Sequence, residues 1–284
     1  MVPPDSPDLI DSAKAVCAQE GLQLLERLGE GSFKQVFLVR SSSGTNYALK
    51  IIRDPTPSPR TAREIESLLR CEHPSIARLI RHGTATVQGI QSEFVIEEHL
   101  AGGSMTARSG STDISIEQAH EMGRHLIDAL RHLRSLELVH RDIKPDNIMF
   151  REDMITPVLV DFGTVRDLSA TSLTDTWLLR GPGTPYFASP EQLTNQKLLI
   201  DWRSDQFSLG VTLFYVVSRV HPYQLPDEPV FAQATVERVA QHGGFSDAFR
   251  HAVQGTALAP LARMVAPWPV QRYKTPQLLQ ADWS

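Results

Sequence analysis

Two short apolar runs in the middle of the chain, residues 148–150 and 158–160, are bounded by polar residues and proline. This pattern predicts the two strands of a hairpin. A hairpin brings its ends together, so the loop before the first run and the loop after the second are expected to share one edge. We therefore expect the side chains of Asp142, Asn147 and Asp161 to converge there.

Elsewhere the spacing of apolar residues predicts strands in the first part of the chain and mostly helices afterwards. The expected strands and their turn cover residues 22–39, 47–52 and 94–100; the expected helices start at Thr61, cover 116–136, and start near Phe207. The last of these is apolar on every side, which indicates a fully buried helix. Residues 105–113 have a loop-like composition, and residues 1–21 are expected to form a helical extension that ends at Gly21.

The polar residues at the predicted hairpin edge suit one kind of chemistry. The oxygens of Asn147 and Asp161 are ligands that Mg2+ prefers, and Mg2+ also binds substrate phosphates. Asp142 then remains to accept a proton from a hydroxyl group. These residues together predict a phosphoryl-transfer site.

The sequence around these residues, HRDIKPDN followed by DFG, resembles the catalytic and metal-binding loops of the eukaryotic-type (Hanks-type) serine/threonine protein kinases. The resemblance implies that Asp142 is the base and that Asn147 and Asp161 hold metal ions. It also implies that Lys144 meets the transferred phosphate. Thr184, in the run GTPYFASPE, is expected to contact Asp142 and Lys144.

The glycine-containing turn near residue 30 resembles the kinase pattern G-x-G-x-x-G-x-V, which Gly29, Gly31 and Val36 match. Lys34 stands where the third glycine belongs, and the sequence leaves open whether it is solvated or makes a second phosphate contact. Lys50 is expected to clamp the α- and β-phosphates of ATP.

The acidic partner of Lys50 is expected on the following helix, as Glu64, with Glu66 as its rival. The resemblance places the remaining nucleotide contacts at Ala48, Glu98 and Leu100.

Glu97 aligns with the position at the back of the adenine pocket. A one-residue shift that puts Ile96 there instead stays open.

Further motifs extend the resemblance over roughly residues 22–280. Asp205 is expected to brace the backbone of the catalytic loop, and Arg272 is expected to form a buried pair with Glu191. Besides Lys34, two positions in these motifs depart from the family pattern: Ser189 replaces an alanine and Trp268 replaces an aspartate.

A cluster of hydroxyl residues follows the DFG motif: Ser169, Thr171, Ser172, Thr174 and Thr176. Since Arg141 precedes the predicted base and arginine pairs strongly with phosphate, we expect phosphorylation of this loop to raise activity.

The resemblance implies an α+β, two-lobed kinase fold. We expect a small antiparallel sheet with one helix over residues 22–98 and a larger, mainly helical lobe over residues 99–284, with ATP and Mg2+ between them. The expected function is phosphorylation of serine and threonine hydroxyls on protein substrates, including the chain itself. The sequence does not fix the oligomeric state.

Composition sets wider limits. The 284 residues are 41% hydrophobic and carry a formal net charge of −5, so we expect no nucleic-acid partner. Two cysteines, Cys17 and Cys71, make no disulfide framework, and no apolar run is long enough for a membrane span. We expect a soluble cytoplasmic protein.

Two other functions remain as alternatives. One is a pseudokinase that binds or scaffolds, favoured by the missing third glycine, the acidic residue at Glu97 and Ser189. The other is a small-molecule kinase, which Lys144-Pro145 and the GTPYFASPE run argue against. Nucleotidyl transfer on the same fold has no support in the sequence.

Overall fold

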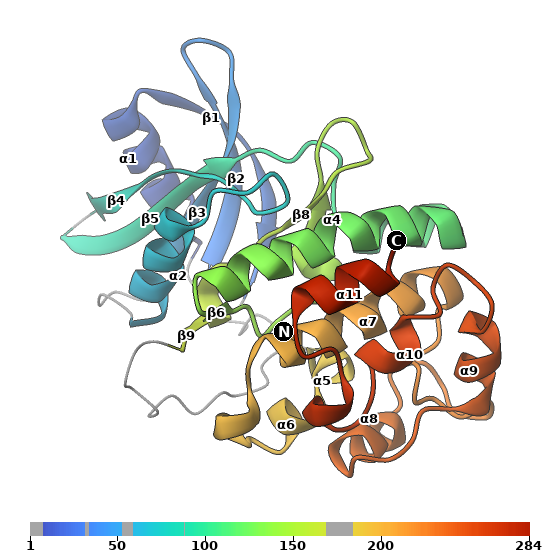
Figure 1. Ribbon diagram of the computed structural model, residues 1–284. Helices are drawn as coiled ribbons and strands as arrows, with labels where there is room; N and C mark the ends of the chain where they lie inside the picture. Colours follow the sequence, from blue (N-terminus) through green and yellow to red (C-terminus); the bar gives the residue numbers. More distant parts are fainter. Residues whose placement is uncertain (1–7, 32–33, 53–58, 88, 169–183) are drawn as a thin grey trace. The chain divides into compact units, whose positions relative to one another are not determined.

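The computed structural model describes residues 8–31, 34–52, 59–87, 89–168 and 184–284 (Figure 1). Some side chains within these ranges, those of Glu64 and Thr184 among them, are outside the description. The chain divides into two compact units. Residues 1–72 and 77–101 form the first, and residues 73–76 and 102–284 form the second.

The first unit is built on a five-stranded antiparallel sheet with the strand order β1-β2-β3-β5-β4. Its elements are α1 (Ile10–Glu20), β1 (Leu22–Glu30), β2 (Lys34–Ser41), β3 (Asn46–Ile52), α2 (Pro59–Arg70), β4 (Leu79–Val87) and β5 (Ile90–Glu98). Successive side chains of a strand point to opposite faces of the sheet. One face therefore carries the apolar side chains beneath α1, and the other carries Lys50.

Helix α1 covers the apolar face of this sheet. Ala13 and Val16 are fully buried in one core cluster with Phe37, Leu49 and Ile96. The helix ends at Gly21, whose φ of 66° is the left-handed conformation that glycine adopts easily. At the other end, the amide of Leu9 donates to the buried Gln35 side chain, 2.9 Å away. The N-terminal helix is thus an integral part of the first unit.

The second unit is mainly helical. Its helices are α3 (Met105–Ser111), α4 (Ile116–Ser135), α5 (Thr184–Phe187), α6 (Pro190–Leu193), α7 (Trp202–Ser218), α8 (Gln233–Ala240), α9 (Asp247–Val253), α10 (Leu261–Met264) and α11 (Pro276–Asp282). Short 3-10 helices are η1 (Pro145–Asn147), η2 (Phe162–Thr164), η3 (Lys197–Leu199) and η4 (Pro269–Gln271). Two small sheets pair β6 (Leu138–Val139) with β9 (Arg166–Asp167), and β7 (Ile148–Phe150) with β8 (Pro157–Leu159).

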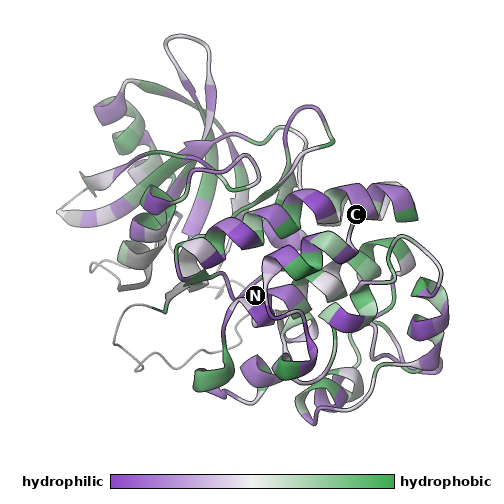
Figure 2. Cartoon of the chain, viewed as in Figure 1, coloured by the Kyte–Doolittle hydropathy of each residue, from purple (hydrophilic) through white to green (hydrophobic). Residues whose placement is uncertain are grey.

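Helix α7 is the centre of this unit and is buried along almost its whole length, as its composition predicts. Helix α4 packs against it and alternates hydrophilic and hydrophobic surface along its length (Figure 2). Helix α11 packs on α4 at Gly123, where an added Cβ would lie 2.2 Å from the Trp283 ring. The Trp283 indole also stacks on His120 and donates to its carbonyl.

The observed architecture confirms the expected α+β fold, with an antiparallel sheet first and a helical unit after it. The hairpin is also confirmed, since β7 and β8 pair antiparallel with Ile148 opposite Leu159. The loop expected over residues 105–113 is wrong, because α3 forms there. The Ser104 hydroxyl caps α3 by accepting the Ala107 amide, a helix-start signal that outweighs the glycine inside the segment.

Candidate functional site

The loop between β6 and β7 gathers the predicted base and its neighbours. The Lys144 ammonium lies 3.0 and 2.9 Å from the two carboxylate oxygens of Asp142. The Asn147 amide nitrogen donates to the backbone carbonyl of Asp142 at 2.8 Å and to its carboxylate at 2.9 Å. The Asp142 side chain is 14% exposed, so it stays accessible at one edge while three polar contacts fix its direction.

Asp205 in α7 holds the backbone of this loop, as its motif predicts. One carboxylate oxygen accepts the His140 amide at 2.7 Å and the other accepts the Arg141 amide at 2.8 Å. Burial raises the pKa of Asp205 to about 7, although both backbone donors favour the charged form. Arg141 has φ of 68°, an uncommon conformation for a residue with a side chain, and the two Asp205 contacts hold it there.

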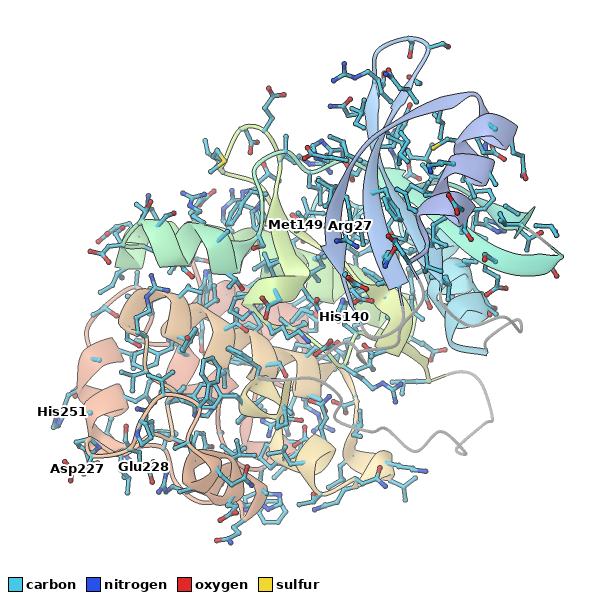
Figure 3. The ribbon with its side chains drawn as sticks, turned by 180° about the vertical axis from the view of Figure 1, so that it is seen from behind. Arg27, His140, Met149, Asp227, Glu228 and His251 are labelled. Carbon is cyan, nitrogen blue, oxygen red and sulfur yellow. The ribbon has the colours of Figure 1, made fainter. Side chains whose placement is uncertain are left out.

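His140 (labelled in Figure 3) ties the base-carrying loop to the segment that follows β8. It is fully buried, packs edge-on against the Phe162 ring and lies with Nε2 3.2 Å from the Val160 carbonyl. Burial lowers the pKa of His140 despite the opposing charges of Asp142 and Asp161, so the imidazole is neutral at physiological pH. A neutral ring suits a structural role.

A second set of contacts joins the same two segments. The Thr164 hydroxyl donates to the His140 carbonyl at 2.9 Å, and Nε of Arg141 donates to the Thr164 carbonyl at 2.6 Å. Because these bonds surround the DFG residues on both sides, the position of Asp161 is coupled to that of Asp142.

The residues expected to hold a metal ion lie on neighbouring backbone segments. The Val160 amide donates to the Asn147 carbonyl at 3.0 Å, which places Asp161, the next residue, beside Asn147. The Asn147 amide nitrogen is directed to Asp142, so its side-chain oxygen is the atom left for a cation. Carboxylate and amide oxygens fit Mg2+, which takes few protein ligands and keeps several waters. Within the described ranges, no group of three or more His, Cys, Asp or Glu residues could hold a metal ion.

In the first unit, the predicted nucleotide residues share one face of the sheet. Val36 lies opposite Lys50 on β2 and β3, and Leu38 lies opposite Ala48, so all four side chains are on the same side. Lys34 lies opposite Ile52 and is on that side as well. The turn before it is closed by the Gly31 amide, which donates to the Lys34 carbonyl at 2.8 Å.

Lys50 forms an ion pair with Glu97, which is not the acidic partner that the sequence predicts. Its ammonium lies 2.6 Å from the Glu97 carboxylate on β5, and both side chains are buried. The expected partner Glu64 lies on α2, with its side chain outside the description. Ile96 is buried with α1 on the opposite face, so it is Glu97, not Ile96, that lies on the Lys50 face.

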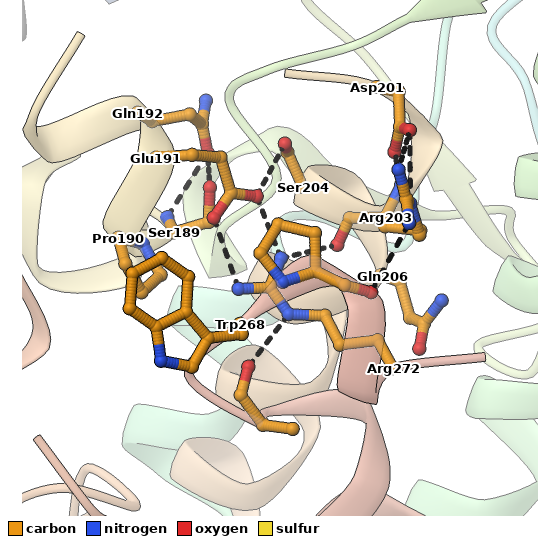
Figure 4. A network of polar contacts seen from close by, with 12 residues as sticks. Ser189, Pro190, Glu191, Gln192, Asp201, Arg203, Ser204, Gln206, Trp268 and Arg272 are labelled. Carbon is orange, nitrogen blue, oxygen red and sulfur yellow. Dashed lines mark hydrogen bonds and ion pairs between the residues drawn. The ribbon is translucent and has the colours of Figure 1, made fainter. Parts of the chain in front are cut away.

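Ser189 and Trp268, which depart from the family pattern, have local partners. The Ser189 hydroxyl and amide both donate to Oε1 of Gln192 (Figure 4). The Gln192 amide nitrogen donates to the Arg141 carbonyl at 2.8 Å. Ser189 thus orients a side chain that supports the catalytic loop. Trp268 stacks on His242 with ring centroids 3.8 Å apart.

The predicted pair between Glu191 and Arg272 is confirmed and is fully buried. Its two bonds measure 2.7 and 3.1 Å, and the Ser204 hydroxyl adds a third bond to Glu191 at 2.7 Å. Burial alone would raise the pKa of Glu191, but the charge and hydrogen bonds of Arg272 together with the Ser204 bond lower it.

None of the helices in the described part of the chain is long and apolar enough to cross a bilayer. Ser169 to Thr176 lie outside the described residues, as does the Thr184 side chain, so their expected roles stay predictions.

Comparison with known proteins agrees with this geometry. The protein kinase domain family matches residues 22–284. Serine/threonine-protein kinase ATG1a of Arabidopsis thaliana is 31% identical over 207 residues, which are 69% of this chain and 31% of that protein. Serine/threonine-protein kinase PknA of a Nostoc species is 26% identical over 269 residues, covering 89% of this chain and 45% of that protein.

Serine/threonine-protein kinase PknB of Mycolicibacterium smegmatis is 29% identical over 270 residues, covering 92% of this chain and 42% of that protein. The chain spans less than half the length of these three relatives. The match over nearly all of the chain, together with the motif residues found in place, confirms the resemblance inferred from sequence. The chain therefore belongs to the protein kinase domain family, of the eukaryotic serine/threonine type.

Proposed function

We propose that this domain transfers the γ-phosphoryl group of ATP to serine and threonine hydroxyls of protein substrates. The observation that carries the proposal is the Asp142–Lys144–Asn147 cluster, held against Asp205 by two backbone hydrogen bonds. An accessible carboxylate with a fixed direction is what proton transfer from an acceptor hydroxyl needs. The names of the relatives support the choice of serine and threonine.

Each residue of the cluster has a role in this mechanism. Asp142 orients the acceptor hydroxyl and takes its proton as the new phosphate ester forms. Lys144, already paired with Asp142, neutralises charge on the transferred group. Asn147 and Asp161 would hold Mg2+, which when bound neutralises phosphate charge and orients the leaving group. Asn147 also fixes Asp142 directly through its amide nitrogen.

We also assign contacts with the nucleotide to residues of the first unit. Lys50 contacts the α- and β-phosphates, and the turn at Gly29 and Gly31 lets backbone amides approach them without a side chain in between. Val36 and Ala48, with Glu98 and Leu100 at the end of β5 and after it, bind the adenine. Lys34 shares the Lys50 face, which supports a second phosphate contact.

A cavity in the second unit borders the catalytic loop. It measures about 580 Å3 and is lined by Pro145 of the catalytic loop and by the aromatic rings of Phe187, Tyr215 and Phe231. It has room for the side chains that flank an acceptor hydroxyl.

The proposal is tested by incubating the purified chain with labelled ATP and Mg2+, with and without myelin basic protein, and mapping the phosphate by mass spectrometry. We expect phosphoserine or phosphothreonine on the added protein and on the chain itself, lost on addition of EDTA. If the chain binds ATP but no phosphate is transferred, it is a binding module. Transfer to small hydroxyl compounds alone would make it a small-molecule kinase.

We further propose that phosphorylation between residues 169 and 184 raises activity through Arg141. Its guanidinium is tied to the Thr164 carbonyl, at the start of the segment that leads to those hydroxyls. Since a phosphate with an arginine forms charge-assisted bonds, phosphatase treatment is expected to lower the rate by about tenfold or more.

Arg141→Ala is expected to lower the rate similarly and to abolish the response to phosphatase. Initial rates before and after phosphatase treatment, for the wild type and the variant, measure both effects. Unchanged rates in either experiment would show that this regulation is absent.

A further inference from the structure

Lys50 and Glu97 form a buried ion pair inside one sheet. Lys50 lies on β3 opposite Val95, and Glu97 lies on β5 opposite Ala48, so the two are diagonal neighbours on one face. The ammonium and carboxylate are 2.6 Å apart, and the side chains are only 8% and 3% exposed. Both partners belong to adjacent central strands, so the pair depends on the strand register alone.

The register between β3 and β5 is fixed by the apolar side chains on the opposite face of the sheet. Leu49, Phe94 and Ile96 alternate with Lys50 and Glu97 along the same strands, and they are buried in the core beneath α1. A one-residue shift of β5 would move Ile96 out of that core and Glu97 into it, which is strongly unfavourable. The sheet therefore presents the Glu97 carboxylate to Lys50 with little freedom.

Stability does not account for a carboxylate at this position. A buried ion pair loses the hydration of both charges, and well-packed apolar residues usually serve the fold as well or better. An apolar residue at position 97 would continue the buried character of Val95 and Ile96. The carboxylate is therefore best explained by what it does to Lys50.

We propose that Glu97 is a positioning residue for Lys50, which rests on the proposed binding of ATP phosphates by Lys50. An ammonium group has three N–H donors, and the bond to Glu97 directs one of them, so it limits the directions in which the other two can point. A flexible lysine side chain loses much rotamer freedom when it is fixed. Glu97 fixes it before the nucleotide arrives, through a contact within the sheet that does not depend on α2.

The test compares binding of ATP, ADP and adenosine to the full chain by isothermal titration calorimetry. Glu97→Gln keeps the shape and an acceptor oxygen but removes the charge. We expect it to weaken ATP and ADP binding by about tenfold, the size of one charge-assisted hydrogen bond, and to leave adenosine binding unchanged. Asp11→Asn is the matched control, since it removes the same charge from exposed α1 on the other face of the sheet.

A second pair of variants guards against a Glu97→Gln protein that does not fold. Lys50→Met removes the ammonium but leaves the Glu97 carboxylate without it, whereas the double variant Lys50→Met/Glu97→Met leaves neither buried charge. We expect both to bind adenosine normally and to bind ATP equally weakly, since Glu97 acts only through Lys50.

Three results would overturn the proposal: ATP binding that is unchanged or tighter in Glu97→Gln, a parallel loss of adenosine binding, or weaker ATP binding in the double variant than in Lys50→Met. A wild-type chain that binds no ATP would instead overturn the proposed function, so the two failures are distinguishable.

Discussion

Replacing Asp142 with alanine is expected to lower kcat for phosphoryl transfer by about 10^2- to 10^4-fold, the range that a positioned general base contributes. The KM for ATP should change little, because Asp142 acts on the acceptor hydroxyl. The fold should survive, since the carboxylate is at an accessible edge and the loop backbone is held by Asp205. Initial rates over a range of ATP concentrations measure both constants.

A structural role for Asp142 would give a different pattern. Asp142→Asn keeps the shape and leaves an oxygen for Lys144, so it should be as inactive as the alanine variant if proton transfer matters. Asp153→Asn is the control, because it removes an equal charge from the exposed turn between β7 and β8. A kcat within threefold of wild type in Asp142→Asn would contradict the role of base. A large loss of thermal stability in both Asp142 variants would point to structure instead.

Several parts of the site follow from sequence because the residues of one motif carry the information. The Asp205 anchor is one, since two consecutive backbone amides of the catalytic loop need an acceptor and the motif supplies a carboxylate on a buried helix. The hairpin β7–β8 is another, because its apolar runs and flanking polar residues are local. In both cases the contact is set by residues that the motif itself contains.

The pair between Lys50 and Glu97 illustrates what sequence leaves open. Aligning the motifs puts Glu97 near the nucleotide, but which acid reaches Lys50 depends on the register between β3 and β5. That register is decided by the apolar residues beneath α1, which no motif records. The helix α3 is not predicted for a related reason: Ser104 is a helix cap only if the chain turns there, and the small and polar residues of the segment are typical of a loop.

Arg272→Met is expected to destabilise the second unit by about 3–5 kcal/mol, since breaking a buried ion pair on one side leaves the other charge unpaired. Glu191 would keep only the Ser204 bond, and the carbonyls of Ala266, Arg203 and Pro267 would lose their donor. All five N–H groups of the guanidinium are used in this network, so no smaller side chain can replace it. Urea unfolding followed by tryptophan fluorescence measures the change.

The double variant Glu191→Met/Arg272→Met distinguishes the loss of the whole ion pair from the cost of leaving one buried charge unpaired. It should recover a substantial share of the loss, because no buried charge remains without a partner. Arg124→Ala, which breaks the exposed pair with Glu121 on α4, should cost less than about 1 kcal/mol. A double variant as unstable as Arg272→Met alone would show that the bonds from Arg272 to the three carbonyls matter more than its charge.

The Glu191–Arg272 pair should also make the free energy of unfolding depend on pH. The pKa of Glu191 is lowered in the folded chain, so the folded state binds a proton less readily than the unfolded one. The stabilisation is therefore fully present above the ordinary glutamate pKa of about 4.5 and is lost as the pH falls through the lower folded value. Unfolding free energies of wild type and Glu191→Met/Arg272→Met, measured from pH 7 to pH 3, should converge as the pH falls below 4.5, because only the wild type has this carboxylate to protonate. Parallel curves would mean that Glu191 has no lowered pKa and that other carboxylates govern acid unfolding.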